Sequence, residues 1–562
     1  MRRNRRPPAV CGVLVSPSGA RALDAEASAE WGLDPFALVE AAGRACANAF
    51  LFLINSHGGT EAQGVKSYYQ LSHPPSCLRA SVRTGREKNS FIVLAGSGNN
   101  AADALVMLRA LILSGHVRQE DCAVYFTRMP GGEKSPLSQA ALSVQRLGVA
   151  VLPWDAAKAA ESLGEACVII DGIAGTGLDG PLRGAALEMA EAVNSLHGRQ
   201  DKFVVSIDVP SGCFDGWRPG MSAVAANATL AIEPQKLCLY TPAARPYAGD
   251  IIPVGSIFHP ALIDKHGEAE LVCWEKAAAC IPPVAKDAYK YERGLVEIRA
   301  GSPGAAGAAR LAAMGAQAAG AGLVRLIVDP SLYPVVAPAC SGVMAVPGGE
   351  AADDSRFSPD AVLLGPGWGR GDDRRLMLEA CLPMEARGVP LVLDADALYL
   401  AKDIVFHGNA ILTPHPGEFA AYTGLPKEQI LADPLPVLRR FTSEKNAVIL
   451  LKSHVLYAAS PDGRIGIING MNPALGMGGT GDLLAGFCAS IAARCKAIEA
   501  RTARAVSPFD GYACACAAAA LLVRTGERFA HKFADPSELA AAAASIAGNT
   551  WLPEKKGDCH HI

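Results

Sequence analysis

The sequence has little of what would assign it to a nucleic-acid-binding, membrane or zinc-stabilised class. Its 52 Lys and Arg residues and 55 Asp and Glu residues leave a net charge of -3, which gives no general attraction to nucleic acid or anionic lipid. No charge-free apolar run is long enough to span a bilayer, since 512–523 is short and mostly alanine. No two cysteines have the CxxC spacing of a structural zinc site. We therefore expect a soluble protein with neither nucleic-acid nor membrane partners.

Cysteines, in contrast, are plentiful, with 16 at irregular spacing. Several lie in apolar surroundings, for example Cys46, Cys167 and the Cys514–Cys516 pair inside an alanine run. Free cysteine is among the most buried residue types, so we expect buried, reduced thiols. Reduced thiols indicate a reducing compartment, which predicts a cytoplasmic location.

A chain of 562 residues is too long for one ordinary core and predicts two or three domains. The basic start reads as a short disordered leader rather than a transit peptide, because no Ser-rich amphipathic stretch follows it. A polar, proline-bearing stretch near 265–290 predicts a boundary. The expected order is a leader at 1–19, a domain at 20–265, a linker at 266–289, a domain at 290–548 and a tail at 549–562. Residues 56–88 look like an insertion.

Alternating strand-like and helical stretches predict an α/β fold in both halves. Apolar runs at 91–94, 123–126, 168–170 and 203–207 alternate with helical segments, and 20–50 reads as helix interrupted near Gly32 and Pro35. The second half repeats the pattern with runs at 295–298, 323–328, 361–364, 390–393, 410–412 and 447–451. This order is typical of mostly parallel sheets covered by helices on both faces.

Polar turns follow many of these strands, and ligands of open α/β sheets bind at the carboxyl ends of strands. In the first half the turns are 96–100, 171–175 and 208–212. Their carboxylate, amide and hydroxyl oxygens can hold a hard monovalent cation, and the glycine turn can hold phosphate. In the second half the turns are 365–367, 394–396 and 413–416, with Lys452 after another strand.

The stretch 472–482 ends in Gly478-Gly-Thr-Gly-Asp482 just before an apolar, helix-like run. Glycines let backbone N–H groups approach an anion, and a helix start supplies unpaired donors and the positive end of the dipole. The sequence therefore predicts a phosphate site. Asp482 beside it can take a proton from a hydroxyl. The alternative, a helix cap in a nucleotide sensor or scaffold, stays open here.

Other second-half residues allow two interpretations each. Asp394 and Asp396 can organise Mg²⁺ through water, or Asp396 can cap a helix. The glycine- and alanine-rich stretch 301–324 can lie against a ligand, or can simply pack tightly. Two prolines hold the turn that presents His415, which favours a binding role over a structural one.

Together these residues resemble the ADP/ATP-dependent NAD(P)H-hydrate dehydratases, a branch of the ribokinase-like superfamily, from about 290 to 523. The ordered set is 290–294, 301–302, the Gly320 turn, 365–369, 393–398, 413–418 and 478–482. The resemblance implies that NADH or NADPH hydrated at the nicotinamide 6 position loses that water after phosphorylation by ADP or ATP, with Mg²⁺. It assigns the general base to Asp482. It assigns hydrate binding to Ala308, Gly367, His415 and Asp482, and nucleotide binding to Lys452, Ser453, His454, Asn472, Gly478, Gly479, Thr480 and Gly481.

The first half, roughly 20–263, resembles the NAD(P)H-hydrate epimerases through 21–24, 38–40, 96–104, 171–177, 208–212, 228–230 and 235–236. The resemblance implies a K⁺ site at Asn100, Asp171 and Ser211, with Asp208 as the proton-transfer residue. It assigns hydrate binding to Asn99, Asn100, Ala101, Ala102, Asp103, Gly175, Thr176, Gly177, Leu178, Asp179, Gly180, Pro181 and Asp208. The combination implies two three-layer αβα domains, Rossmann-like then ribokinase-like, in a homo-oligomer.

Departures from the family patterns leave alternatives. Ala101, Ala102 and Ala104 replace glycines of the first loop; where such a position needs φ > 0, alanine costs about 1–2 kcal/mol, and the added methyls can crowd a phosphate. A dehydratase with a degenerate first domain is therefore one alternative, and a ribokinase-like small-molecule kinase is another. Ser453 replaces a glycine, and Asp510 stands where a histidine is common.

Overall fold

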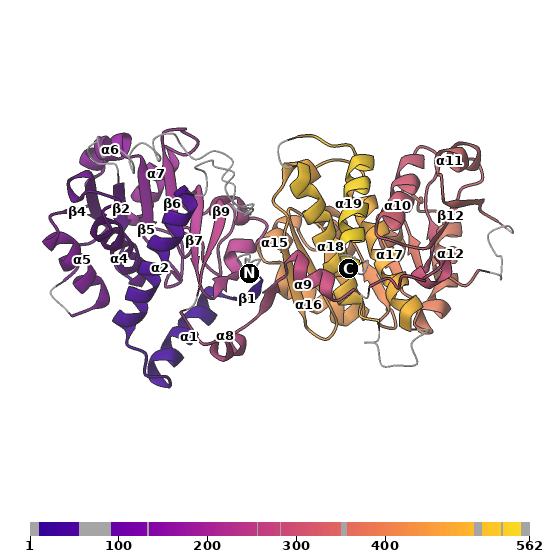
Figure 1. Cartoon of the computed structure of the whole chain (residues 1–562), viewed down its shortest axis with the longest axis horizontal. Helices are drawn as coiled ribbons and strands as arrows, with labels where there is room; N and C mark the ends of the chain where they lie inside the picture. Colours follow the sequence, from indigo (N-terminus) through magenta and orange to yellow (C-terminus); the bar gives the residue numbers. More distant parts are fainter. Residues whose placement is uncertain are drawn as a thin grey trace, which may run out of the picture. The chain divides into compact units, whose positions relative to one another are not determined.

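The computed structural model describes residues 11–551 except 56–90, 132–133, 256, 282, 350–356, 500–508 and 530–531. The described chain forms two compact units, 12–269 and 270–551 (Figure 1). The predicted insertion at 56–88 lies outside the described residues, as do 1–10 of the predicted leader and 552–562 of the predicted tail.

The first unit is built on a seven-stranded sheet in which every pair is parallel, in the order β4-β3-β2-β5-β6-β7-β9. The strands are β2 (Phe91–Ala95), β3 (Cys122–Phe126), β4 (Ala150–Pro153), β5 (Val168–Gly172), β6 (Phe203–Ile207), β7 (Ala228–Ile232) and β9 (Asp250–Val254). The helices are α1 (Pro17–Ala29), α2 (Pro35–Asn55), α4 (Asn99–Leu113), α5 (Pro136–Arg146), α6 (Ala156–Glu165), α7 (Ala185–Asn194) and α8 (Pro260–Lys265).

Side-chain alternation along the strands separates two cores. Phe91 and Val93 of β2 pack with α2, α4 and α5 on one face. Ile92 and Leu94 pack with α6 and α7 on the other face. The predicted three-layer α/β arrangement is therefore confirmed for this unit. It brings the ends of β2, β5 and β6 to one edge of the sheet.

The predicted leader at 1–19 is wrong from residue 12 onwards. Gly12–Val15 form β1, which pairs in parallel with β8 (Gln235–Lys236), and Pro17 begins α1. Ser16 caps that helix by accepting a hydrogen bond from the Gly19 amide at 3.0 Å. Strand β1 is only four residues long, which is too short to show a periodic pattern. Its partner β8 lies more than 200 residues away, so no local signal marks the pairing.

Helix α2 is apolar along most of its length. Its segment Pro35–Ile54 is long and apolar enough to cross a membrane by length and composition. In the structure Val39, Phe50 and Leu53 are buried in the core shared with α4. The core packing accounts for the composition of this helix.

The second unit has a mixed sheet in the order β13-β12-β11-β14-β15-β16-β17-β18-β19-β10. It is parallel except where β18 pairs antiparallel with β17 and β19. The strands are β10 (Ala269–Leu271), β11 (Leu295–Arg299), β12 (Leu323–Val328), β13 (Met344–Pro347), β14 (Ala361–Leu364), β15 (Leu391–Leu393), β16 (Ala410–Leu412), β17 (Val448–Leu451), β18 (Val455–Ala459) and β19 (Ile465–Asn469).

Helices of the second unit include four that share its largest core: α10 (Ala306–Ala318), α17 (Thr480–Glu499), α18 (Gly511–Gly526) and α19 (Pro536–Trp551). The others are α9 (Trp274–Ala279), α11 (Tyr333–Ala339), α12 (Asp372–Ala386), α13 (Asp396–Leu400), α14 (Pro416–Thr423), α15 (Lys427–Ala432) and α16 (Pro434–Lys445).

Close packing of α10 on α17 explains the small-residue stretch near 301–324. A Cβ at Gly315 would lie 2.4 Å from the Leu483 carbonyl oxygen, and one at Gly486 would lie 2.2 Å from that of Ala312. Only glycine permits this approach at both positions. Tight packing is therefore confirmed for the part of the stretch that contacts α17, and a ligand contact elsewhere in it stays a prediction.

Two further expectations need correction. The predicted linker at 266–289 is not a loop, because it contains β10, which extends the second sheet beside β19, and α9. Reduced thiols were expected throughout, but Cys11 and Cys273 form a disulfide. Sequence spacing gave no sign of it, since 262 residues separate the pair. Cys46, Cys167, Cys514 and Cys516 are buried free thiols as expected.

Candidate active sites

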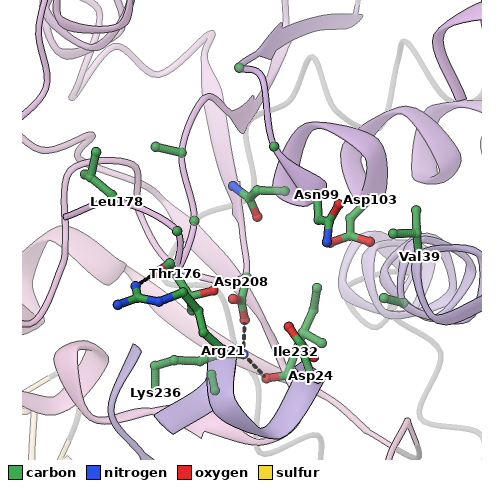
Figure 2. Close-up of a pocket in the computed structure, with 18 of the residues that line it drawn as sticks. Arg21, Asp24, Val39, Asn99, Asp103, Thr176, Leu178, Asp208, Ile232 and Lys236 are labelled. Atoms are coloured by element: carbon green, nitrogen blue, oxygen red, sulfur yellow. Dashed lines mark hydrogen bonds and ion pairs between the residues drawn. The ribbon is translucent and has the colours of Figure 1, made fainter. Parts of the chain in front are cut away.

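A cavity of about 730 Å³ opens at the carboxyl ends of β2, β5 and β6 in the first unit (Figure 2). Its lining contains Asn99, Asn100 and Asp103 from the start of α4, and Asp208 from the end of β6. Gly175, Thr176, Gly177, Leu178 and Pro181 also line it, as the resemblance implies. Asp179 and Gly180 do not, but Asp179 forms an ion pair of 3.2 Å with Arg21 of α1. Arg21 also donates to the Thr176 carbonyl.

The turn between β2 and α4 is shaped for close approach. A Cβ at Gly96 would lie 1.8 Å from the Ile173 carbonyl oxygen, so no other residue fits there. Gly98 precedes the first residue of α4, and the helix begins at Asn99. The start of α4 therefore faces the cavity with unpaired N–H donors.

Ala101, Ala102 and Ala104 do not disturb this site. None of them has positive φ; the only described non-glycine residues that do are Asp208, Ala395 and Asn446. Their side chains are fully buried in the core shared with α2, and none of the three lines the cavity. The strain and crowding considered from the sequence therefore do not occur. The predicted hydrate contacts of Ala101 and Ala102 are not supported by side-chain placement.

Asp171 and Ser211 contact each other behind the cavity, and Asn100 of the lining lies near them. Asp171 is fully buried and accepts hydrogen bonds from Ser206 Oγ at 2.7 Å, the Ser211 amide at 2.9 Å and Ser211 Oγ. Ser211 Oγ accepts from the Ala174 amide at 2.8 Å, and Asn100 packs against the next residue, Gly175. Asn100 is buried with no hydrogen-bond partner for either atom of its amide group.

Such an orphaned amide oxygen beside a buried carboxylate and a hydroxyl suits a hard monovalent cation. Burial raises the pKa of Asp171 in spite of its hydrogen bonds, and a cation would favour its ionised form. The three predicted K⁺ ligands therefore fit the ion by donor type.

Asp208 and Lys236 form a buried ion pair. Asp208 follows β6 in the left-handed region at φ +66, and its Oδ1 lies 2.6 Å from Lys236 Nζ. Lys236 Nζ also donates to the Ile232 carbonyl at 3.0 Å. Burial raises the pKa of Asp208, and the ammonium opposes that effect. The resemblance to the epimerases assigned no role to Lys236.

Two more carboxylates line the cavity near this pair. Burial, with Asp208 and Asp24, raises the pKa of Asp103 well above its usual range, and its Oδ1 has no partner. Burial likewise raises the pKa of Asp24 on α1 to about 6. Like charges gathered around one lysine favour uptake of a proton, so this cavity can hold an acid and a base at neutral pH.

In the second unit, Asp482 occupies the first turn of α17, whose first residue is Thr480. The turn before it is held by Thr480 Oγ1, which donates to the Leu475 and Met477 carbonyls at 3.2 and 3.0 Å. Gly479 is left-handed at φ +96, and a Cβ there would lie 2.5 Å from Leu311 Cδ1. The amides that begin a 20-residue helix are thus exposed beside a carboxylate, as predicted.

Asp482 lies in an acidic neighbourhood that contains one lysine. Burial, then the charge of Asp394, raises the pKa of Asp482 to about 6, and Lys452 opposes them. Lys452 forms a close ion pair with the buried Asp394, to which Thr413 Oγ1 also donates at 2.8 Å. Burial opposes the charge on Lys452, but Asp394 and Glu418 outweigh it and raise its pKa. An ammonium is therefore held near the start of α17.

His415 has a structural role that the sequence did not reveal. Its Nδ1 accepts hydrogen bonds from the Gly417 and Glu418 amides at 3.0 and 3.2 Å, and Glu418 accepts in return from the His415 amide at 2.8 Å. This is a capping box at the start of α14. The ring remains largely exposed, but its Nε2 lies 3.4 Å from Glu418 Oε1, so the capping partner also faces the second ring nitrogen.

The turn after β14 packs closely against the start of α10, the helix rich in small residues. Gly367 is left-handed at φ +56, and a Cβ there would lie 2.6 Å from Ala305 Cβ and 3.1 Å from Ala308 Cβ. Its carbonyl accepts from Ser302 Oγ at 2.9 Å. The structure therefore brings Ala308 and Gly367 together, as the resemblance implies.

The remaining predicted residues are engaged locally. Asp396 accepts from the Gly369 amide and Arg370, at 2.8 and 2.7 Å. Ser453 forms a turn with Val455, with His454 exposed beside it, and Asn472 caps a short turn by accepting from the Ala474 amide at 2.9 Å. Asp510 caps α18 and pairs with Arg464 at 2.7 Å.

Asp394 and Asp396 do not converge on a common point, since one holds Lys452 and the other holds the turn at Gly369. Among the described residues, no group of three or more His, Cys, Asp or Glu side chains is placed to hold a metal ion. Their placement therefore gives no support to joint Mg²⁺ binding, and a role for either carboxylate alone, through water, stays a prediction.

These features define a two-unit α/β protein with a carboxylate-lined cavity in one unit and, in the other, a glycine turn that leads into a helix with Asp482 in its first turn. A family model for the YjeF-related protein N-terminus matches residues 36–238, and one for NAD(P)H-hydrate dehydratase matches 296–547. The bifunctional NAD(P)H-hydrate repair enzyme Nnr of Gloeobacter violaceus is 32% identical over 428 residues, covering 72% of this chain and 80% of the relative. The chain therefore belongs to the bifunctional NAD(P)H-hydrate repair enzyme family.

Two further similarities were found. The enzyme of the same name from Coxiella burnetii is 29% identical over 429 residues, covering 75% of this chain and 84% of the relative. Among solved structures, an ADP/ATP-dependent NAD(P)H-hydrate dehydratase from Bacillus subtilis, co-crystallised with ATP and Mg²⁺, is 26% identical with a TM-score of 0.43. It covers 50% of this chain, and the match spans 99% of the solved chain.

Proposed function

We propose that the protein repairs hydrated nicotinamide nucleotides with both of its units. The first unit interconverts the R and S forms of NAD(P)H hydrate, and the second dehydrates the S form at the expense of ADP or ATP. The observation that carries the second activity is Asp482 in the first turn of α17, beside exposed amides and with its pKa raised to about 6. Such a group accepts protons at neutral pH.

In the dehydration, the amides from Gly478 to Gly481 stabilise charge on the phosphoryl group in transfer. Asp482 takes the proton of the 6-hydroxyl while the oxygen of that hydroxyl attacks the phosphorus of the nucleotide. Phosphate then leaves C6 with the electron pair of the C6–O bond, a proton passes from C5 to water, and the electrons of the C5–H bond re-form the ring double bond. Lys452, fixed by Asp394, holds positive charge near the start of α17. Mg²⁺, if the nucleotide carries it, neutralises phosphate charge and keeps several waters.

The first unit supports epimerisation through the cavity around Asp208. The alanines at 101, 102 and 104 lie in the core, which argues against the alternative of a degenerate domain. Asn100, Asp171 and Ser211 would hold K⁺. That ion supplies a fixed positive charge behind the cavity, next to the turn 174–175 that forms part of its lining.

The cellular location and the oligomeric state also belong to this proposal. Buried free thiols such as Cys46 and Cys488 support a cytoplasmic location, and the Cys11–Cys273 disulfide is the observation against it. A homo-oligomer is expected from the family resemblance, and light scattering of the purified chain would measure it.

One assay tests both activities. Purified protein is incubated with S hydrate, then with R hydrate, together with Mg²⁺, K⁺ and either ADP or ATP, while NADH absorbance is followed. We expect recovery from both epimers, with recovery from R abolished by omitting K⁺. No recovery from S with either nucleotide would refute the dehydratase. Recovery from S but not from R above the uncatalysed rate would refute the epimerase.

A further inference from the structure

Asp24 is a carboxylate of the first unit's cavity for which the described residues form no ion pair. Asp103 is buried, and Asp208 is bound to Lys236. Asp24 lies on α1, its side chain stays exposed to the cavity, and no described residue donates a hydrogen bond to it. Figure 2 shows Asp24 and Asp208 arising from different elements of the lining, near Lys236.

We propose that Asp24 is the second proton-transfer residue of the epimerase, acting with Asp208. The inference rests on the proposed epimerase function and adds a catalytic group to it. In the route we infer, inversion at C6 has the hydroxyl leave from one face and water return on the other. That change requires a proton donor for the departing oxygen and a proton acceptor for the incoming one, and two separate carboxylates supply both.

The inversion proceeds through two proton transfers. Protonated Asp24 gives its proton to the 6-hydroxyl, the C6–O bond breaks with its electron pair leaving on water, and the N1 lone pair forms a C6=N1 double bond. Water then adds to C6 on the opposite face, the double-bond electrons return to N1, and Asp208 takes the proton released by that water. The net result is the opposite epimer and a proton moved from Asp24 to Asp208. The reverse reaction moves it back.

Electrostatics places the resting proton on Asp24 rather than Asp208. Lys236 stabilises the Asp208 carboxylate directly at 2.6 Å, whereas the charge of Asp208 favours the neutral form of Asp24. Burial raises the pKa of Asp24 to about 6, so its proton is available and replaceable near neutrality. The other charged groups facing this cavity are Arg21, Asp103, Arg183 and Glu233.

The substitution Asp24→Asn tests the assignment in the full-length protein. R and S epimers are separated chromatographically, with the uncatalysed rate subtracted. We expect kcat for epimerisation to fall by about 10²–10⁴-fold with little change in KM. Asp24→Glu should recover part of the rate because it keeps the carboxylate. The control Glu30→Gln makes the same charge change at an exposed position just after α1 and should leave the rate unchanged.

Two readouts separate catalysis from a structural role. In the wild type, kcat/KM for epimerisation should fall above about pH 6, because Asp24 then loses the proton that it donates. In Asp24→Asn this decrease at alkaline pH should be absent. In water labelled with ¹⁸O, each inversion should place one solvent oxygen on C6.

Several outcomes overturn the inference. These are an Asp24→Asn rate close to wild type, a lost rate accompanied by lost NADH binding or a lowered melting temperature, or inversion without ¹⁸O uptake. A wild-type protein that dehydrates S hydrate but gives no epimerisation overturns the proposed epimerase itself. That result is distinct, because Asp24 would then have no reaction to serve.

Discussion

Lys236 Nζ lies 2.6 Å from Asp208 Oδ1 in the wall of the first cavity, and both side chains are buried. The two residues are 28 positions apart and meet only because β6 and β8 place them at one edge of the unit. Breaking a buried ion pair by removing one partner leaves an uncompensated charge. The pair therefore sets the protonation state of the residue assigned to proton transfer.

Lys236→Met should impair epimerisation and shift its pH dependence. Without the ammonium, burial acts unopposed on Asp208 and its pKa rises further, so the carboxylate needed as a base is present only at higher pH. We expect kcat/KM at pH 7 to fall at least tenfold, with its acidic limb moved to higher pH. The pH–rate profile with R hydrate measures this. An exposed lysine paired with Glu26 serves as the control through Lys265→Met, and an unshifted profile in Lys236→Met would contradict the assignment.

Asn100→Leu should remove the K⁺ dependence of the first unit while sparing the second. Leucine has the same branched skeleton but no amide oxygen, so the orphaned ligand near Asp171 and Ser211 is lost. We expect the K⁺ concentration for half-maximal epimerisation to rise more than tenfold, or activation to disappear. Titration of K⁺ against the R-hydrate rate measures this. Dehydration of S hydrate by the same sample is the internal control, and unchanged K⁺ activation would exclude Asn100 as a ligand.

Ala104→Gly restores the family's glycine and should reduce stability without improving catalysis. Ala104 is fully buried within α4 and packs on Gly172, where a Cβ would lie 2.8 Å from its methyl. Removing that methyl and adding a mid-helix glycine should cost about 1–2 kcal/mol. Urea unfolding of the variant measures the loss. A faster epimerisation rate in Ala104→Gly would instead show that the methyl obstructs the site.

The alanine positions illustrate where sequence reasoning stops. The pattern of strands and polar turns located the edge of each sheet, and the Gly478–Asp482 stretch correctly predicted a helix start with an adjacent carboxylate. Whether a loop glycine needs φ > 0 depends on where the helix begins, and α4 begins at Asn99, ahead of all three alanines. The Lys236–Asp208 pair and the disulfide of Cys11 are long-range contacts with no local periodic signal. Edge strand β4 was missed because it is largely exposed and ends in proline.

The pH dependence of dehydration should report Asp482. Burial and the charge of Asp394 raise its pKa to about 6, and as a base it must be deprotonated. Dehydration kcat/KM should therefore rise about tenfold per pH unit below pH 6 and level off above it. Asp482→Asn should lower kcat by about 10²–10⁴-fold while ADP and ATP still bind, because the amides that begin α17 remain. Stopped assays across pH 4.5–8 with S hydrate, alongside nucleotide titration by calorimetry, measure both effects; a variant that keeps turnover, or a limb that persists in Asp482→Asn, would assign the base elsewhere.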